Sequence, residues 1–261
     1  MTEQSTQPTA EDVRREVRDT YAAIARSETS SCCGSASESD RVSQGFSYSA
    51  EELAAVPEGS NMGLGCGNPT AIAALEPGET VLDLGSGGGF DCFLAARQVG
   101  SEGHVIGVDM TPDMIEKARA NARKVEAANV DFRLGEIEHL PVADESVDAV
   151  ISNCVINLSV DKPAVYREIF RVLRPGGRVS ISDVVARDTL PEDLARDLKM
   201  VASCFGGAAT IAEITVWLNE IGSAEVSVKV DETAAKAVDD WAPGRRLGEY
   251  VASALIEAIR P

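Results

Sequence analysis

A short apolar run followed by four glycines, VLDLGSGGGFD at residues 81–91, constrains the fold of this chain more than any other feature. The residues before Gly85 have the composition of a buried strand, and those after Gly89 have the composition of a helix. A glycine turn at the start of a helix leaves backbone N–H groups open to a ligand, because no side chain blocks the approach. The segment therefore predicts a strand–turn–helix unit that binds a small polar ligand.

Strand and helix patterns alternate from this unit onward. The expected strands cover residues 79–85, 104–110, 130–135, 146–153 and 176–185, and the expected helices cover residues 91–99, 111–127 and 161–175. Repeated alternation of this kind is typical of an α/β fold with a doubly wound, mostly parallel sheet that helices cover on both faces. The chain of 261 residues is long enough for one enlarged domain of this class.

Segments outside this alternation carry most of the cysteines. An amphipathic helix is expected near the start, from the helical spacing of Val13, Val17, Tyr21 and Ile24. Residues 27–40 and 57–69 are rich in Ser and Gly and are expected to form loops, the first with Cys32 and Cys33 and the second with Cys66. After Asp183 we expect helices at 191–204 and 214–222 and a strand at 225–231. Residues 248–261 are expected to form a closing strand, with a helix as the alternative.

The balance of charge excludes some partners. Asp and Glu number 42 against 24 Lys and Arg, which gives a formal net charge of −18 at pH 7. A surface of that sign repels nucleic-acid phosphates and anionic lipid, so we expect neither nucleic-acid nor membrane binding. The N-terminal residues lack the apolar segment of a secretory signal, and no apolar run is long enough to span a membrane. We therefore expect a cytoplasmic protein with reduced thiols.

Residues around the glycine turn narrow the choice of ligand. Asp109 ends the second expected strand, where a carboxylate can accept hydrogen bonds from both hydroxyls of a ribose. Phe90 stands where the dinucleotide fingerprint needs its last glycine. Asp83, two residues before Gly85, suits a ligand with an amino group and fits a diphosphate badly. These features favour S-adenosylmethionine over a nicotinamide dinucleotide.

Three motifs, DLGSGGGFD, VIGVDM and LRPGGRVSISD, together resemble those of the class I S-adenosylmethionine-dependent methyltransferases, over residues 80–185. The resemblance implies a Rossmann-like fold and a set of cofactor residues. The residues implied for the methionine part are Asp83, Gly85, Ser86 and Gly87. Asp109 and Met110 would contact the ribose and the edge of the adenine. Ile137 and Glu138, in GEIEHLP, would flank the adenine. Asn153 is a further candidate for cofactor binding. The alternative is a glycine-rich turn in another doubly wound protein.

The same resemblance divides the chain into three parts. Residues 1–68 would form an N-terminal extension of a helix and cysteine-bearing loops, and residues 69–186 would form the S-adenosylmethionine-binding core. Residues 187–261 would form a small C-terminal α+β segment that completes the acceptor site and the sheet.

Three cysteines lie where a methyl acceptor is expected to bind. Cys154, in SNCVINLS, follows the fourth expected strand, at the sheet edge where ligands of open α/β sheets bind. Methyltransferases that act on amines often carry Asn/Asp-Pro-Pro-Tyr/Phe at this point. Cys66 lies in the glycine-rich loop before the core, and Cys204 ends the helix expected at 191–204. Their wide spacing excludes a compact zinc knuckle, but separate loops can converge, and several thiols favour a soft, thiophilic acceptor.

This arrangement of cysteines resembles that of the arsenite methyltransferases. Cys32 or Cys33, then Cys66 in GCGNP, Cys154 in SNCVINLS, and Cys204 follow the order found in that family, over residues 30–210. The resemblance implies that Cys66, Cys154 and Cys204 bind trivalent arsenic, supplied as arsenite or its thiol conjugates. The products would be methylated arsenicals, formed in a detoxification reaction. It also implies that an N-terminal cysteine assists and forms a disulfide during the cycle, with thioredoxin or glutathione as the reductant.

Two other functions remain open at this point. A methyltransferase of a small organic acceptor, such as a quinone, would stay active after Cys154→Ser. A non-catalytic thiol protein would bind arsenic without consuming the cofactor, and antimony(III) is a further soft acceptor. Cys92 lies among apolar residues and is expected in the core. The two histidines, His104 and His139, are expected to be structural, because attack by an arsenic lone pair needs no general base.

Overall fold

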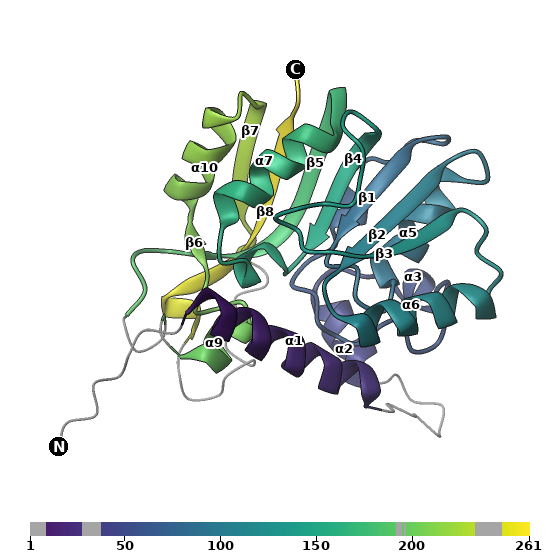
Figure 1. Ribbon diagram of the computed structural model, residues 1–261, viewed down its shortest axis with the longest axis horizontal. Coiled ribbons are helices and arrows are strands. Elements are labelled where there is room, and N and C mark those ends of the chain that lie inside the picture. The colour runs from purple at the N-terminus through teal and green to yellow at the C-terminus, as the bar shows by residue number, and fades with distance from the viewer. Residues whose placement is uncertain (1–8, 28–37, 192–194, 196, 233–246) are drawn as a thin grey trace.

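The computed structural model describes residues 9–27, 38–191, 195, 197–232 and 247–261, so Cys32 and Cys33 lie outside the described residues. Within these ranges an eight-stranded sheet has the order β3-β2-β1-β4-β5-β8-β7, with β6 paired to β5 (Figure 1). The strands are β1 (Thr80–Leu84), β2 (His104–Asp109), β3 (Val130–Leu134), β4 (Val147–Asn153), β5 (Leu173–Ala186), β6 (Ala209–Thr210), β7 (Ala224–Val230) and β8 (Val251–Ile259). Neighbours among β1 to β6 pair in parallel, and β8 runs antiparallel to both β5 and β7. The mostly parallel sheet expected from the sequence is confirmed.

Helices cover both faces of the sheet. Successive residues of a strand point to opposite faces and therefore pack against different helices. Val81 of β1 packs in a core with α5 (Phe90–Val99) and α6 (Pro112–Lys124). Leu82, on the other face, packs in a core with α7 (Lys162–Val172) and α10 (Ile211–Glu220). Both side chains are fully buried. This two-sided burial explains why Val81, Leu82 and Leu84 of β1 are all large and apolar.

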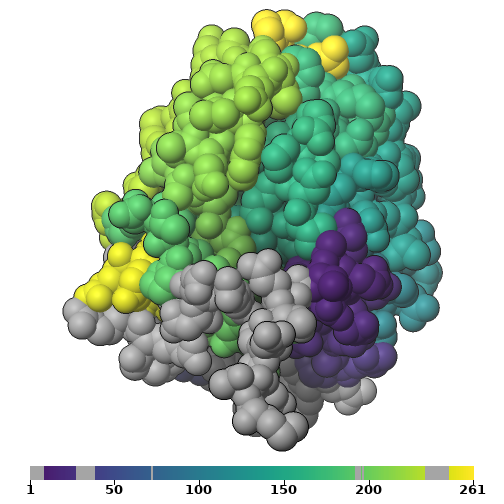
Figure 2. Space-filling view, turned by 60° about the vertical axis from the view of Figure 1, so that its left-hand side comes forward, coloured from purple at the N-terminus to yellow at the C-terminus, as the bar shows by residue number. Residues whose placement is uncertain are grey.

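One helix lies apart from these two layers. α1 (Ala10–Arg26) crosses the carboxyl ends of the parallel strands and contacts α6 and α9 (Leu198–Ala202) (Figure 1). It begins with a capping box, in which Thr9 and Asp12 each accept a backbone N–H of the other. Val17 is 2% exposed, as the helical spacing of apolar residues predicts. Figure 2 shows α1 on the surface, packed against the central part of the chain.

The structure differs from the sequence expectations at several elements. α2 (Glu38–Gly45) begins inside the segment expected as a loop, and α3 (Ala50–Ala54) was not expected. α7 ends earlier than expected, because Leu173 already pairs with Val147 in the sheet. Residues 192–194 and 196 of the helix expected at 191–204 lie outside the described residues; α9 ends at Ala202, and Cys204 lies beyond its end with a left-handed φ of 67°. The C-terminal residues form β8, which confirms the strand rather than the helix.

Two single-turn 3₁₀ helices, η1 (Ile156–Leu158) and η3 (Leu247–Glu249), follow β4 and precede β8. α4 (Pro69–Ile72) joins the N-terminal loops to the core. In the part of the chain that the structure describes, no helix is both long and apolar enough to cross a membrane.

Candidate active site

A cleft lies at the carboxyl ends of β1, β2 and β4, with α1 on one side. Every residue expected to bind the cofactor lines this cleft, namely Asp83, Gly85, Ser86, Gly87, Asp109, Met110, Ile137, Glu138 and Asn153. Cys154 lines it as well. The fold therefore brings the expected cofactor residues and one expected acceptor thiol to a single cavity.

The turn after β1 adopts a backbone that glycine tolerates best. Gly85 and Gly89 have φ values of 68° and 91°, in the left-handed region. A Cβ on Gly85 would collide with the side chain of Val155, which follows β4. A Cβ on Gly89 would lie 2.7 Å from the ring of Phe132. Gly85 thus lets the turn lie directly against the residues after β4, where Cys154 is placed, and Gly89 lets it lie against Phe132 of β3.

Two buried carboxyl groups line the cleft close to each other. Asp83 is 2% exposed and accepts from the thiol of Cys92 (3.2 Å), while Asp91 accepts from the hydroxyl of Tyr48 (2.5 Å) and from Nδ2 of Asn153 (3.1 Å). Burial, with the nearby charge of Asp91, raises the pKa of Asp83 well above its usual value. Burial also raises the pKa of Asp91, to about 6. Among the described residues no Lys or Arg pairs with either carboxyl group, so the cleft favours a cationic ligand.

Other polar groups in the cleft have hydrogen-bonding capacity left for a ligand. The hydroxyl of Ser86 is buried and has no partner among the described residues. Asp109 accepts from the backbone N–H groups of Gly87 (3.0 Å) and Thr111 (2.8 Å), one on each oxygen, so each oxygen keeps acceptor capacity. An unpaired hydroxyl, a free acceptor pair and two carboxyl groups without a paired cation fit the amino-acid and ribose groups of S-adenosylmethionine.

The side of the cleft expected to hold the adenine is less polar. Ile137 is 9% exposed, and Met110 lies against the apolar cluster that contains the cysteines. Glu138 is fixed there by the hydroxyl of Ser159, which donates to its carboxylate (2.6 Å). An apolar wall with one carboxylate at its edge suits a flat, partly polar ring.

Three cysteines from distant parts of the chain meet at the wall of this cleft. Cys66, Cys154 and Cys204 are 0%, 8% and 3% exposed and belong to one apolar cluster. The thiol of Cys154 contacts the thiols of both Cys66 and Cys204, and Cys204 Sγ also donates to the carbonyl oxygen of Cys154 (2.8 Å). The spacing in the sequence allowed separate loops to converge, and in the structure Cys154 contacts both of the other thiols.

Glycines on both sides of Cys66 allow its close approach. Its backbone N–H donates to Oδ1 of Asn153 (2.9 Å), and its carbonyl accepts from the hydroxyl of Ser253 on β8 (2.7 Å). A Cβ on Gly65 would lie 2.5 Å from Asn153 Nδ2, and a Cβ on Gly67 would lie 2.5 Å from the hydroxyl of Ser182. The Gly-Cys-Gly sequence is therefore required for the loop to pack against Asn153 of β4 and Ser182 of β5.

The surroundings of the thiols keep them protonated at neutral pH. Burial raises the pKa of Cys66 to about 11. Contact with Cys154, together with burial, raises the pKa of Cys204 well above its usual value. Contact with Cys204 lowers the pKa of Cys154, but contact with Cys66 and burial raise it further, so the net shift is upward. The cluster therefore favours an acceptor that enters as a neutral molecule.

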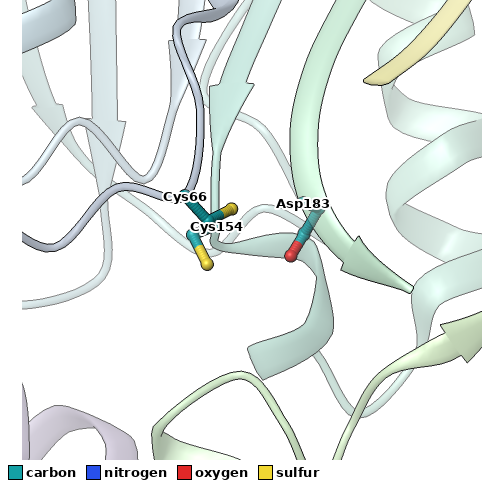
Figure 3. Close-up of side chains that lie close together, drawn as sticks. All are labelled: Cys66, Cys154 and Asp183. Atoms are coloured by element: carbon teal, nitrogen blue, oxygen red, sulfur yellow. The ribbon is translucent and has the colours of Figure 1, made fainter. Parts of the chain in front are cut away.

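Sequence reasoning missed three groups next to the thiols and the cofactor residues. Tyr21 of α1 reaches the cleft and its hydroxyl contacts the thiol of Cys204. Asp183 lies beside Cys66 and Cys154, and all three ligand atoms lie within 4.8 Å of one another (Figure 3). Tyr48 holds Asp91. The only available signals were a tyrosine on the inner face of an amphipathic helix and an aspartate that ends the LRPGGRVSISD motif.

The remaining cysteines and histidines are placed as follows. Cys92 is fully buried in the core against β2 and β3, as expected, and its thiol also contacts Asp83. His104 begins β2, away from the cleft, and His139 contacts the carbonyl oxygen of Glu138. Neither histidine lines the cleft.

Comparison with known proteins agrees with this geometry. A methyltransferase domain family matches residues 75–222. An arsenite methyltransferase of Halobacterium salinarum is 50% identical, over 96% of this chain and 67% of its own length. The chain belongs to the arsenite methyltransferase family. Another relative in this family, from Aquipseudomonas alcaligenes, is 46% identical over 58% of this chain and 45% of its own length.

A solved structure extends the similarity to three dimensions. The arsenic(III) S-adenosylmethionine methyltransferase of Chlamydomonas reinhardtii aligns with a TM-score of 0.63 and 32% identity, over 84% of this chain and 73% of its own. The Rossmann-like class I methyltransferase fold is thereby confirmed. The chain spans about two thirds of the length of the Halobacterium relative and about half that of the Aquipseudomonas relative.

Proposed function

We propose that this chain transfers methyl groups from S-adenosylmethionine to trivalent arsenic held by Cys66, Cys154 and Cys204. The observation that carries the proposal is the convergence of three buried thiols beside the cleft that the cofactor residues line. A single buried cysteine is usually a small core residue. Three on separate segments, with Cys154 in contact with both of the others, offer a soft trivalent element the ligands that it prefers.

The protonated thiols suit the binding step. Arsenite at neutral pH is As(OH)₃, so three S–H groups and three As–OH groups exchange to give three As–S bonds and three water molecules. No charge enters or leaves the buried cluster, which avoids the cost of burying thiolates. Three sulfur ligands leave the arsenic pyramidal, with its lone pair on the open side. Because Cys154 lines the cleft, that lone pair can point toward the cofactor.

The residues of the cleft would hold the cofactor by its polar groups. Asp83 and Asp91 supply negative charge toward its cationic groups, and Asp109 and Ser86 supply hydrogen bonds toward its ribose and amino-acid parts. Bound there, S-adenosylmethionine supplies an electrophilic methyl group. No proton leaves the arsenic, so the absence of a histidine from the lining of the cleft is compatible with the reaction.

Completion of the cycle needs electrons, since each methyl transfer formally oxidises the arsenic. We assign their supply to a thiol reductant such as thioredoxin or glutathione, acting through a protein disulfide. Cys32 or Cys33 is the proposed partner in that disulfide, and both lie outside the described residues. The chemistry requires reduced thiols at the start of each cycle, which is the state expected in the cytoplasm.

The test is a methylation assay with product speciation. Purified, reduced protein is incubated with S-adenosylmethionine, arsenite and a thiol reductant, and the products are separated by chromatography with elemental detection. Methylated arsenic is expected, together with consumption of the cofactor. Arsenic binding without cofactor consumption would instead indicate a sequestering protein. Repeating the assay with antimonite tests the second soft acceptor.

A further inference from the structure

Asp183, which no sequence motif assigned to the site, lies against the proposed arsenic ligands. It is on β5, 2% exposed, and one of its oxygens lies within 4.8 Å of the sulfur atoms of Cys66 and Cys154. Figure 3 shows the three side chains together, with Cys66 on the loop before the core, Cys154 after β4 and Asp183 on β5. A buried acid this close to protonated thiols is unfavourable unless it has a function or strong hydrogen bonds.

The carboxylate is held in place by four N–H groups. Oδ2 accepts from the backbone of Ile156 (3.0 Å) and Asn157 (3.4 Å), and Oδ1 accepts from the side chain of Asn157 (2.9 Å) and the backbone of Val184 (2.7 Å). Burial raises the pKa of Asp183 to about 6, while the backbone donors oppose that rise. The group therefore carries a negative charge of fixed position and cannot rotate away.

These hydrogen bonds also exclude a role as an arsenic ligand. A carboxylate offers about four lone-pair directions, and four donors occupy them. Trivalent arsenic, a soft element, takes sulfur in preference to a carboxylate oxygen. The contribution of Asp183 to the site is therefore its charge.

Methyl transfer to arsenic creates a charge that Asp183 can stabilise. The arsenic lone pair forms the new As–C bond while the C–S bond of the donor breaks, and its electron pair returns to sulfur as a neutral thioether. The positive charge of the sulfonium thus moves to arsenic, which becomes four-coordinate and cationic. No proton and no external electron take part in this step.

Resting on the proposed function, we infer that Asp183 is the counter-charge that stabilises the cationic, four-coordinate arsenic formed by methyl transfer. A fixed charge aimed at a position where opposite charge develops lowers the barrier without a cost of reorganisation. The neutral arsenic bound before transfer gains little from it. Asp183 therefore acts on the rate of transfer and hardly at all on arsenic binding.

Asp183→Asn separates these two effects. Single-turnover formation of the thioether product, with arsenite bound in advance, is expected to slow by about 100-fold. The Kd for arsenite, measured by equilibrium dialysis with elemental detection and without cofactor, is expected to stay within about threefold. The matched control is Asn157→Ala, which removes one of the donors to Asp183 but leaves its charge. It is expected to lose less than about tenfold in rate.

Lys162 gives a second test that does not depend on the folding of the Asp183 variant. It is partly buried, donates to the carbonyl oxygen of Ser159 (3.0 Å), and interacts electrostatically with both Asp183 and Cys204. Its ammonium group opposes positive charge on the arsenic. Lys162 also lowers the pKa of Asp183, so the comparison is made at pH 8.5, where Asp183 stays ionised in both proteins. There Lys162→Gln is expected to raise the single-turnover rate, by about three- to tenfold. A purely structural role for this region predicts a fall instead.

The outcomes separate the inference from the proposed function. Failure of the unchanged protein to methylate arsenite overturns the proposed function and the inference with it. If the unchanged protein is active, the inference alone is overturned by any of three results: a rate within threefold in Asp183→Asn, a parallel loss of arsenite affinity, or a slower rate in Lys162→Gln at pH 8.5.

Discussion

At the scale of single residues, the site depends on the close approach of the Cys66 loop to Cys154 and on the protonation of the thiols. Cys66 reaches Cys154 because glycines flank it, and its backbone is fixed by Asn153 and Ser253. The thiols are buried with raised pKa values, so the site is prepared for a neutral acceptor. Each of these properties leads to a measurement on a single side chain or a single equilibrium.

Gly67→Ala tests the close approach of the loop. The added Cβ would meet the hydroxyl of Ser182 at 2.5 Å, so the loop must shift and carry Cys66 with it. The free energy of unfolding is expected to fall by about 1–3 kcal/mol in urea titrations. The Kd for arsenite is expected to rise at least tenfold, because the sulfur atoms no longer meet. Gly45→Ala is the control, since nothing lies within 4 Å of its added Cβ, and an equal loss there would refute the explanation.

The raised thiol pKa values predict that arsenite binding exchanges no protons near pH 7.5. The pKa of Cys66 is about 11 and those of Cys154 and Cys204 are also raised, so all three groups keep their protons below pH 8.5. The hydroxyl groups of neutral arsenite then leave as water with the thiol protons, and affinity stays flat from about pH 6.5 to 8.5. Thiolates would instead take up one proton each, up to three per arsenic. Calorimetric titration in two buffers of different ionisation enthalpy measures the number of protons taken up per arsenite bound. Uptake of one proton or more would contradict the protonated state of the thiols.

At the scale of elements, α1 covers the site and links its two sides. Val17 packs into the cluster that contains the three cysteines, and Tyr21 contacts Cys204. The helix bridges α6, on the cofactor side, and α9, on the side of Cys204. Its docking therefore contributes to the position of the thiols as well as to the wall of the cleft.

Val17→Ala tests that docking. Val17 is 2% exposed, and loss of its two methyl groups is expected to lower the free energy of unfolding by about 2 kcal/mol. Hydrogen exchange of α9 is expected to speed up as its contact with α1 loosens. The same substitution at Val216, which is 51% exposed on α10, is the control and is expected to change stability by less than about 0.5 kcal/mol. Equal effects at the two positions would mean that α1 is not held by this contact.

Helices and strands could be predicted from the sequence where the periodicity of apolar residues is strong. They could be predicted less well where tertiary contacts determine where an element ends. The core strands and α5 and α6 follow from apolar runs and the glycine turn. The end of α7 could not be placed, because pairing of Leu173 with Val147 overrides local helix propensity. The early end of α9 depends on the left-handed backbone of Cys204, which no pattern in the sequence announces for a non-glycine residue.

At the scale of the whole molecule, the site exists only because distant segments close on one another. Cys66 precedes the core, Cys154 follows β4, Cys204 follows α9, and β8 supplies Ser253 behind Cys66. The order of cysteines predicted a shared ligand, but their contact is a property of the folded chain. The same holds for Asp183, which in the sequence is one more residue of an apolar strand. The net charge of −18 has little bearing on capture of arsenite, because that acceptor is neutral.

The central claim is that three specific thiols make arsenic the methyl acceptor. The most direct measurement is the rate of arsenite methylation, with products separated by chromatography and elemental detection, in single Cys→Ser variants at positions 66, 154 and 204 and in Cys92→Ser as the buried control. The account predicts methylated arsenic from the unchanged protein and from the Cys92 variant, and none from the other three. Methylation at the unchanged rate after Cys154→Ser would contradict it.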